Sequence, residues 1–222
     1  MSEDYAKKAH TLFDKYYPIE IDTEIPFIEK KKLMNEWWNL HFKLLIESGL
    51  NRSDLKDIVE NGIVKFRDGV QWFIDYLHEN SIPLVILSAN GVGDSIEMYL
   101  EKIECNHPNI CRITNRFIWD EEGNAVSHYG PLINSHNKDE TIINEIPEVY
   151  EKIKDQRNVI LIGDCVGDIG MVEGFKHENL LKLGFLNHDP EKLIKNFEEN
   201  YDVVILGDGD FSFVNNLIRE LK

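Results

Sequence analysis

Long hydrophobic runs are absent from the sequence. The longest apolar stretches, such as VVIL (203–206) and VILIG (159–163), have the length of strands. They fall far short of the roughly 20 residues that a membrane-spanning helix needs. The N-terminal segment MSEDYAKKAH is charged from its third residue, which is not the pattern of a signal peptide. We therefore expect no membrane partner and a cytoplasmic location.

Cysteine is scarce. The three cysteines are odd in number and form no CxxC pair, so the sequence predicts neither a disulfide framework nor a zinc site, and a reducing cytosol is the simplest interpretation. The eight histidines are scattered, and we expect no histidine metal site. Five of those without ligand spacing are His107, His128, His136, His177 and His188.

Basic residues are also few, with 24 lysines and arginines against 40 acidic residues and a net charge of −16. This balance disfavours polymeric nucleic acid, because binding to its phosphates needs a positive footprint. A small phosphate ester stays possible, since a bound cation reverses the sign of the local charge.

The 222 residues fit one large domain or one domain with a sizeable insertion. The first part has the spacing of helices, over residues 2–16 and 27–48, with an irregular connection expected over 16–26 because of Pro18 and Pro26. We predict a helical cap lobe over 1–65, followed by a core domain.

The core domain, 66–222, alternates apolar strands with amphipathic helices, which predicts an α/β fold with a parallel sheet covered on both faces. A β-hairpin is expected near 117–129. The expected strands are 82–90, 112–117, 158–164, 180–186 and 202–207; the expected helices are 68–80, 93–103, 139–154 (interrupted at Pro147), 169–175, 190–201 and 211–222.

Polar side chains follow two of these strands. Ser88 ends VILSAN, Asp164 ends VILIGD with Asp168 four residues later, and Lys138 lies between them in the chain. Ligands of open parallel sheets bind beyond the C-terminal ends of the strands. Two carboxylates favour Mg²⁺, which commonly bridges acids to a substrate phosphate, and the hydroxyl and ammonium suit the phosphate itself. Taken singly, each residue has an ordinary interpretation as a turn residue, a solvated lysine, a turn acid or a helix cap.

The helical lobe holds a further candidate set. Trp37 and Trp38 are adjacent and so point about 100° apart on a helix. One is expected in the core, and the other is free to stack on a base. Glu20 is either an acceptor for an exocyclic amine or a solvated acid.

A serine in a strand-end SAN, an isolated lysine and then GDxxxD resembles the haloacid dehalogenase (HAD) superfamily. Within it, the chain is similar to the cytosolic pyrimidine 5′-nucleotidases (5′-nucleotidase type III) from about residue 2 to the C-terminus. The segments that carry this likeness are KYYPIEID (15–22), SIPLVILSANGVGD (81–94), SHNKDE (135–140), NVILIGDCVGDIGM (158–171), LLKLGFLN (180–187) and YDVVIL (201–206).

The resemblance implies hydrolysis of nucleoside 5′-monophosphates with Mg²⁺, with UMP and CMP the expected substrates and 7-methylguanosine monophosphate also compatible. Ser88 and Ala89 match the phosphate-binding motif, and Lys138 matches the lysine that stabilises the phosphoryl charge. Asp164 matches the direct metal ligand, and Asp168 matches its second acidic partner, with a catalytic role. In the cap, Glu20 and either Trp37 or Trp38 are the implied base-recognition residues. The protein is expected to be a monomer or a weak homo-oligomer.

The sequence departs from this family in three places. Asn90 stands where glycine is usual, and Cys165 stands where serine is common. The larger departure is the absence of D-x-D-x-T, whose first aspartate is the family's nucleophile and whose strand is the central one of its sheet. GDGD (207–210) lacks the threonine and follows the other motifs.

Two hypotheses follow from this absence: an incomplete 5′-nucleotidase, or a non-catalytic remnant that at most binds nucleotide or Mg²⁺ weakly. Either leaves strands at the sheet centre with unpaired backbone groups. A phosphate-accepting receiver domain fits less well, because Lys138 precedes Asp164 in the chain.

Overall fold

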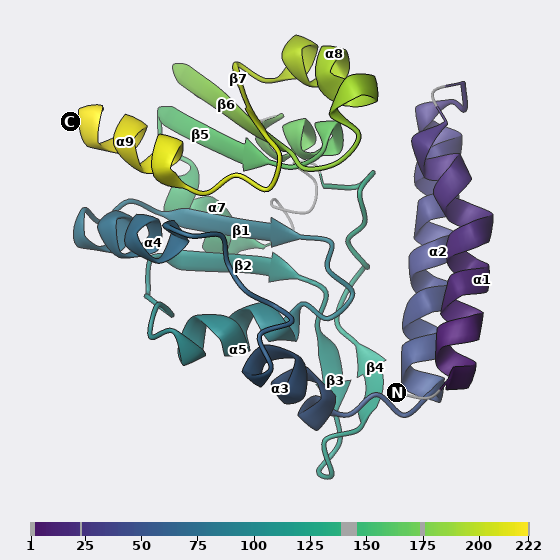
Figure 1. Ribbon diagram of the computed structural model, residues 1–222. Helices are drawn as coiled ribbons and strands as arrows, with labels where there is room; N and C mark the ends of the chain where they lie inside the picture. Colours follow the sequence, from purple (N-terminus) through teal and green to yellow (C-terminus); the bar gives the residue numbers. More distant parts are fainter. Residues whose placement is uncertain (1–2, 23, 139–145, 174–175, 222) are drawn as a thin grey trace. The chain divides into compact units, whose positions relative to one another are not determined.

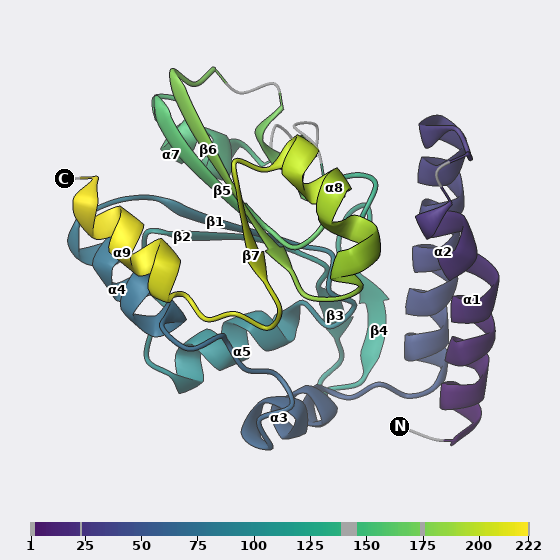
Figure 2. The same cartoon turned by 45° about the horizontal axis from the view of Figure 1, so that its top comes forward.

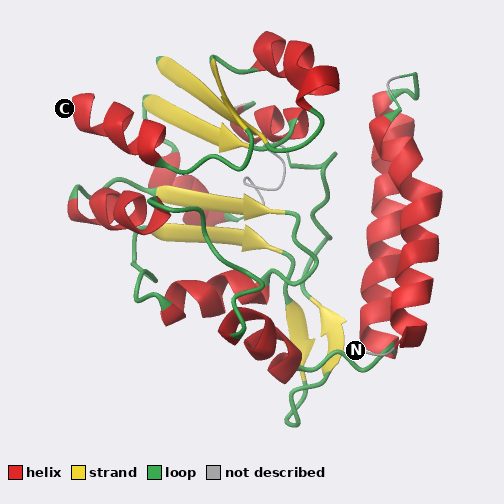
Figure 3. Ribbon diagram, in the orientation of Figure 1, coloured by secondary structure: helices red, strands yellow, loops and turns green. Residues whose placement is uncertain are grey.

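The computed structural model describes residues 3–22, 24–138, 146–173 and 176–221. No helix in these ranges combines the length and the apolar character needed to cross a membrane. Figures 1 and 3 show the elements. The helices are α1 Glu3–Ile21, α2 Phe27–Glu47, α3 Arg52–Glu60, α4 Val70–Glu79, α5 Asp94–Lys102, α7 Pro147–Ile153, the 3₁₀ helix η1 Val166–Val172, α8 Pro190–Asn200 and α9 Ser212–Glu220; the strands are β1 Leu84–Ser88, β2 Ile110–Thr114, β3 Phe117–Trp119, β4 Ala125–His128, β5 Asn158–Gly163, β6 Asn179–Leu186 and β7 Val203–Leu206.

The chain divides into two compact units. Unit 1 comprises 1–65, 87–104 and 113–137, and unit 2 comprises 66–86, 105–112 and 138–222. The predicted division, a cap lobe over 1–65 and a core over 66–222, stays a prediction about domains.

In unit 1, α1 and α2 pack side by side (Figure 1). Their contact is built on Tyr16, Met34 and Trp37, which are all buried. Ring stacking adds to this packing, since the Tyr16 and Trp37 rings lie 5.8 Å apart at 10°. The apolar stripe that predicted these helices is therefore their mutual interface.

The prediction of an irregular connection over 16–26 is wrong for residues 16–21, which are helical. Helix α1 runs through Pro18 to Ile21, and the break is confined to the residues just before α2. A proline inside a helix removes one hydrogen bond to the carbonyl four residues earlier. Here that carbonyl belongs to Asp14, and both residues are exposed, so water is available to the unpaired group.

The hairpin expected near 117–129 is present in unit 1, where β3 and β4 pair antiparallel. It packs through Phe117 onto Phe42 of α2, with the two rings 4.8 Å apart at 15°. The surrounding cluster of buried residues also contains Leu45, Leu50, Leu55, Ala125 and Leu132.

Unit 2 contains a three-stranded parallel sheet in the order β5-β6-β7. Helix α8 packs on β6 and β7 through a cluster of Leu186, Phe197 and Tyr201, and Figure 2 shows it beside β7. The ring of Phe211, at the start of α9, stacks on Phe185 of β6. The predicted α/β class with parallel strands is confirmed.

The parallel strands do not form one continuous sheet. β1 and β2 make a separate two-stranded sheet, in which Figure 1 shows both strands running in the same direction. Within the described ranges, β5 pairs only with β6 and β1 pairs only with β2. Among the described residues, each of these two strands therefore has a partner strand on one edge only.

Helix α7 begins at Pro147, the position where a proline suits a helix start. The first half of the helix expected over 139–154 lies largely outside the described residues.

Candidate active site

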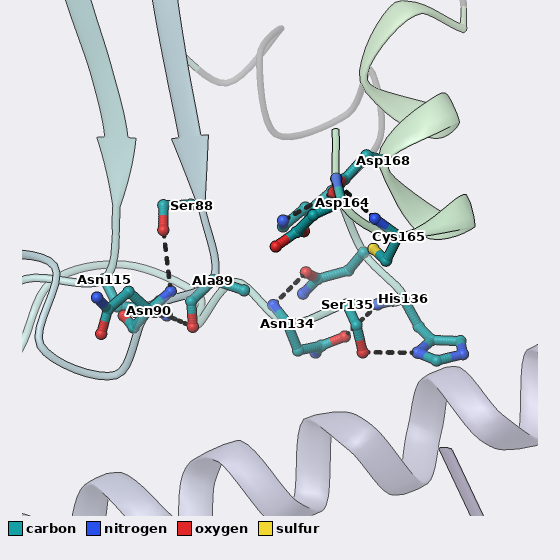
Figure 4. Close-up of polar contacts among 12 residues, drawn as sticks. Ser88, Ala89, Asn90, Asn115, Asn134, Ser135, His136, Asp164, Cys165 and Asp168 are labelled. Atoms are coloured by element: carbon teal, nitrogen blue, oxygen red, sulfur yellow. Dashed lines mark hydrogen bonds and ion pairs between the residues drawn. The ribbon is translucent and has the colours of Figure 1, made fainter. Parts of the chain in front are cut away.

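In unit 2, four residues gather at the C-terminal end of β5, and we call them the acid–lysine cluster: Lys138, Asp164, Cys165 and Asp168. β5 ends at Gly163, the next two residues form a turn, and η1 then places Asp168 back beneath that turn. Figure 4 shows Asp164, Cys165 and Asp168 around the turn.

The carboxylate of Asp168 is fully engaged within this cluster. Its Oδ1 accepts a hydrogen bond from Lys138 Nζ at 2.9 Å. Its Oδ2 accepts hydrogen bonds from the backbone N–H groups of Asp164 at 2.9 Å and Cys165 at 3.2 Å. Asp168 thus fixes both the turn that follows β5 and the position of the lysine.

The ion pair of Lys138 and Asp168 is buried, with side chains 11% and 3% exposed. Burial acts to lower the pKa of Lys138, but attraction to Asp168 outweighs it and the net pKa is raised. Lys138 is therefore a fixed positive charge at neutral pH, which suits a group that stabilises phosphoryl oxygens.

Asp164 is the exposed acid of the cluster. Desolvation and the neighbouring Asp168 carboxylate raise its pKa, while the positive charges of Lys138 and Arg67 oppose the rise. One ligand atom each from Asp164, Cys165 and Asp168 lies within 4.8 Å of the others. A bound cation would relieve the repulsion between the two acids.

The donor set of this cluster fits Mg²⁺. Mg²⁺ takes oxygen ligands and usually keeps several waters beside one or two carboxylates, which an exposed Asp164 above a buried Asp168 allows. The thiol of Cys165 adds no hard ligand, because burial raises its pKa to about 12 and it stays protonated.

Gly163 is required by the close packing beneath the turn. A Cβ at this position would lie 2.6 Å from Tyr201 Oη and 2.7 Å from Asp168 Oδ2. Tyr201 also donates a hydrogen bond from its hydroxyl to the carbonyl of Cys165 at 2.5 Å. The sequence gave no signal of this packing beyond the place of Gly163 directly before Asp164.

Arg67 is a residue of this region that the sequence did not single out. Its guanidinium donates to Asp208 Oδ1 at 2.7 Å, to the Gly209 carbonyl at 2.8 Å and to Asn187 Oδ1 at 2.7 Å. It also lies 4.7 Å from the centre of the Phe185 ring. The segment GDGD (207–210), which the sequence analysis considered only as a nucleophile candidate, thus hydrogen-bonds Arg67. A single arginine before a helix gives no sequence signal of such a contact.

In unit 1, Ser88 is the last residue of β1, and Ala89 begins the loop that follows. Ser88 Oγ accepts a hydrogen bond from the Asn90 N–H at 3.2 Å (Figure 4). Asn90 Oδ1 accepts one from the Val92 N–H at 2.9 Å. Asn90, the departure from the family's glycine, therefore closes the loop with its own side chain.

Asn115 holds this loop in place and was missed by the sequence analysis. It is 2% exposed, and its Nδ2 is within hydrogen-bond distance of three carbonyls, those of Ala89, Asn90 and Ile133, the last at 2.9 Å. Its Oδ1 accepts the N–H of Ile133 at 2.7 Å. The only sequence signal was its place directly after β2.

The segment that leads to Lys138 is held by asparagines. Asn134, fully buried, donates to Asn35 Oδ1 at 2.5 Å and accepts the His136 N–H at 2.9 Å. Ser135 donates to Glu20 Oε1 at 2.5 Å, so Glu20 is a hydrogen-bonded residue of this segment and not a fully solvated acid.

Of the two tryptophans considered for stacking on a base, Trp38 is the one with an accessible side chain. Trp37 is 7% exposed and packs on Tyr16 and Met34, which leaves no open face for a base. Trp38 is half-buried, and its buried Nε1 has no hydrogen-bond partner among the residues that the structure describes. A buried indole N–H without a partner is uncommon and marks a position that a ligand acceptor can satisfy.

The predicted site residues therefore lie in two groups. Lys138, Asp164 and Asp168 are together in unit 2. The others belong to unit 1: Ser88, Ala89, Glu20, Trp37 and Trp38. Their roles in catalysis or binding stay predictions.

Comparison with known proteins identifies the family to which this chain belongs. The family model for pyrimidine 5′-nucleotidase (UMPH-1) matches residues 1–222. A 7-methylguanosine phosphate-specific 5′-nucleotidase A of Xenopus laevis is 34% identical over 220 residues, 99% of this chain and 75% of that protein.

Solved structures agree. The crystal structure of cytosolic 5′-nucleotidase IIIB bound to cytidine matches with a TM-score of 0.87 at 28% identity, over 100% of this chain and 74% of that one. A phosphoserine phosphohydrolase-like protein from Francisella tularensis matches with a TM-score of 0.59 at 15% identity, over 97% and 89% of the two chains, and shows the fold alone. The chain belongs to the pyrimidine 5′-nucleotidase (UMPH-1) family, whose members are 5′-nucleotidases with a HAD-like fold.

Proposed function

We propose that this protein hydrolyses nucleoside 5′-monophosphates with Mg²⁺, and that UMP and CMP are its substrates. The family supplies the reaction class, since its members are 5′-nucleotidases. The observation that carries the proposal for this chain is the acid–lysine cluster, in which a buried Lys138–Asp168 pair lies beside the exposed Asp164.

Each residue of the cluster has a distinct proposed role. Asp164 would ligate Mg²⁺ directly, and Asp168 would be the second acid that contributes negative charge to the metal site. Mg²⁺, when bound, supplies neutralisation of charge on the phosphoryl oxygens. Lys138 contributes a further positive charge to the phosphoryl group, and its hydrogen bond to Asp168 keeps it aimed without reorganisation.

The phosphate-binding role is proposed for Ser88 and the amide groups of its loop. The two hydrogen bonds within the loop and the buried Asn115 hold its backbone in one conformation. A loop fixed before the substrate arrives loses little entropy on binding, which favours affinity for the phosphate.

The nucleophilic aspartate of the family has no counterpart among these residues. The 222 residues contain no D-x-D-x-T. We propose that the nucleophilic aspartate belongs to a strand that pairs with the free edge of β5, because this edge is adjacent to the turn bearing Asp164. Without that strand, the chain is expected to bind nucleotide and Mg²⁺ and to turn over little.

Base recognition is proposed for Glu20 and Trp38. A carboxylate accepts from an exocyclic amine, and an aromatic face stacks on a base. Cytidine fits such a pair, and the matched cytosolic 5′-nucleotidase IIIB is described as bound to cytidine. The name of the Xenopus relative favours a second candidate, 7-methylguanosine monophosphate, whose base offers both an amine and a positive charge.

The activity is placed in the cytosol by the same proposal, with no membrane or nucleic acid partner and a monomer or weak homo-oligomer as the working state. None of the three cysteines, which all lie in the described ranges, forms a disulfide, and this suits a reducing compartment. Size-exclusion chromatography with light scattering tests the oligomeric state.

The test measures binding and turnover separately. Phosphate release is followed from UMP, CMP, 7-methylguanosine monophosphate and GMP, and Mg²⁺-dependent CMP binding is followed by calorimetry. The 222-residue chain is compared with a chain extended by the family's D-x-D-x-T strand.

We expect both chains to bind CMP and only the extended chain to release phosphate. Asp164→Asn should abolish both the binding and the phosphate release. Turnover by the 222-residue chain within tenfold of the extended chain would overturn the proposal for the nucleophile. Equal rates on GMP and CMP would overturn the base preference, and faster hydrolysis of 7-methylguanosine monophosphate would favour the second candidate.

A further inference from the structure

A second group of metal-ligating side chains lies away from the acid–lysine cluster, also within unit 2. Asp75 is on α4, and Cys105 and His107 are on the loop between α5 and β2. We propose that this group, which we call the thiol–imidazole cluster, binds a thiophilic divalent cation, with Zn²⁺ as the physiological candidate.

The ligand atoms are already close together. His107 Nε2 lies 2.7 Å from Asp75 Oδ1, and Cys105 Sγ lies 3.5 Å from the same oxygen. One atom from each residue lies within 4.8 Å of the others. Bond lengths of 2.0–2.3 Å and a tetrahedral angle separate zinc ligands by roughly 3.3–3.8 Å. The sulfur–oxygen pair has this spacing, and the nitrogen–oxygen pair needs to open by well under 1 Å.

The cluster is closed on one side and open on the other. Cys105 is fully buried, while the side chains of His107 and Asp75 are 20% and 42% exposed. Three protein ligands that leave a solvent-facing fourth position are the arrangement of a zinc site that keeps a water molecule.

A neighbouring histidine fixes the plane of the ligating ring. His78 stacks on His107, with ring centres 4.2 Å apart at 8°. It follows Asp75 by three positions on α4, which places both on one face of the helix. Such a partner sets the orientation of a ligand ring without itself needing to bind the metal.

The loop that presents the thiol and the imidazole is also fixed. Glu104 adopts a left-handed conformation with φ 58°, which turns the chain immediately before Cys105. The N–H of His107 then donates to the carbonyl of Cys105 at 2.9 Å, and Lys152 Nζ donates to the carbonyl of Pro108 at 3.3 Å. The Cys-x-His unit is thus held in a tight turn with both side chains directed at α4.

The two clusters of unit 2 differ in the metal they favour. Sulfur and imidazole ligands select Zn²⁺, whereas carboxylate and water select Mg²⁺. Residues 75 and 105 are 30 positions apart in the chain, as the contact between them records, so no sequence spacing indicated the group. The proposal departs from the expectation that the cysteines and histidines form no metal site, and the experiment below decides between the two.

The ordinary alternative is a charge-assisted hydrogen bond between His107 and Asp75 that binds no metal. Cobalt distinguishes the two, because a tetrahedral Co²⁺ site with a thiolate gives charge-transfer absorption and intense visible bands. The full 222-residue chain is titrated with Co²⁺ and, by calorimetry and thermal denaturation, with Zn²⁺ in a large excess of Mg²⁺.

Cys105→Ser and His107→Gln are compared with the matched controls Cys111→Ser, Cys165→Ser and His188→Gln, each checked for folding by circular dichroism. We expect one equivalent of Zn²⁺ to bind, a Co²⁺ thiolate band, and a rise in the unfolding temperature. Cys105→Ser and His107→Gln should weaken Zn²⁺ binding by about tenfold or more, and the controls should not.

Should Cys105→Ser unfold, Asp75→Asn provides the second variant, because it keeps the side-chain volume and removes the charge. An unchanged Zn²⁺ affinity in His107→Gln and Asp75→Asn overturns the proposal. So does a Co²⁺ band that disappears in Cys165→Ser and survives in Cys105→Ser, since that result assigns the metal to the turn after β5.

Discussion

Lys138 Nζ donates a hydrogen bond to Asp168 Oδ1 at 2.9 Å, and the two side chains are nearly inaccessible to solvent. Removing one partner of a buried ion pair leaves the other charge without compensation, which is far more costly than loss of an exposed pair. This relationship gives the first prediction.

Replacing Asp168 by Asn is expected to lower the free energy of unfolding by about 3–5 kcal/mol, because Lys138 is left buried without a counter-charge. Urea denaturation measures the change. The matched control is Lys8→Met, which breaks the exposed Lys8–Asp4 pair and should have no resolvable effect. A double replacement, Lys138→Met with Asp168→Asn, should be less destabilising than the sum of the singles; additivity would contradict the coupling.

Gly163→Ala is expected to destabilise the protein by about 1–3 kcal/mol, since its Cβ would meet Tyr201 Oη at 2.6 Å and Asp168 Oδ2 at 2.7 Å. The control is Gly91→Ala, whose Cβ would meet only His41, at the ordinary distance of 3.8 Å. Thermal denaturation of both variants measures the difference. Equal stability of the two would show that the packing beneath the turn relaxes freely.

Asn115→Ala should loosen the loop that carries Ser88. The substitution removes the donor that faces the carbonyls of Ala89, Asn90 and Ile133, at a cost of about 1–3 kcal/mol for buried groups left unpaired. Hydrogen exchange over residues 88–92 should speed up, while exchange in β6 should change only by the global loss of stability. Asn39→Ala, at an exposed position of α2, is the control. Unchanged exchange in the loop would remove Asn115 from its positioning role.

Stability is expected to fall as the pH drops below about 6.5, the ordinary pKa of histidine. Burial lowers the pKa of His41, and burial together with the positive charge of Lys30 lowers that of His136. The unfolded chain therefore takes up these protons at a higher pH than the folded chain does. The stabilisation from keeping both rings neutral is complete above the unfolded pKa and is lost as pH falls towards the folded values.

Urea midpoints at pH 7.5, 6.5 and 5.5 measure this dependence. His41→Gln and His136→Gln should each flatten the decline, and the exposed His188→Gln should not. A decline that is as steep in both variants as in the unmodified chain would contradict the assignment.

The fold class and the positions of Asp164 and Asp168 after a strand could be predicted from the sequence, because both depend on local patterns. Continuous apolar strands followed by Asp164 and Asp168 specify a sheet edge with acids, whatever packs around them. The hydrogen bond of Lys138 to Asp168 joins residues 30 positions apart, and the sequence did not predict it.

Other features depend on packing that no local pattern records. Pro18 predicted the end of the first helix, but α1 continues through it, because water is available to the exposed Asp14 carbonyl that lost its hydrogen bond. Asn115 is one of many asparagines, and its burial against three carbonyls arises from the meeting of distant loops. Cys105 and His107 contact Asp75 across some 30 positions, directly after Glu104 with its left-handed φ of 58°.

Within the described ranges, β5 pairs on one edge only, with β6. Val159, Ile160 and Ile162 on this strand are only partly buried, so a strand added there gains apolar contacts as well as backbone hydrogen bonds. If that strand also brings the nucleophile, one binding event completes the sheet and arms the site. Under the proposed function, completion of the sheet and delivery of the nucleophilic aspartate would then be a single step.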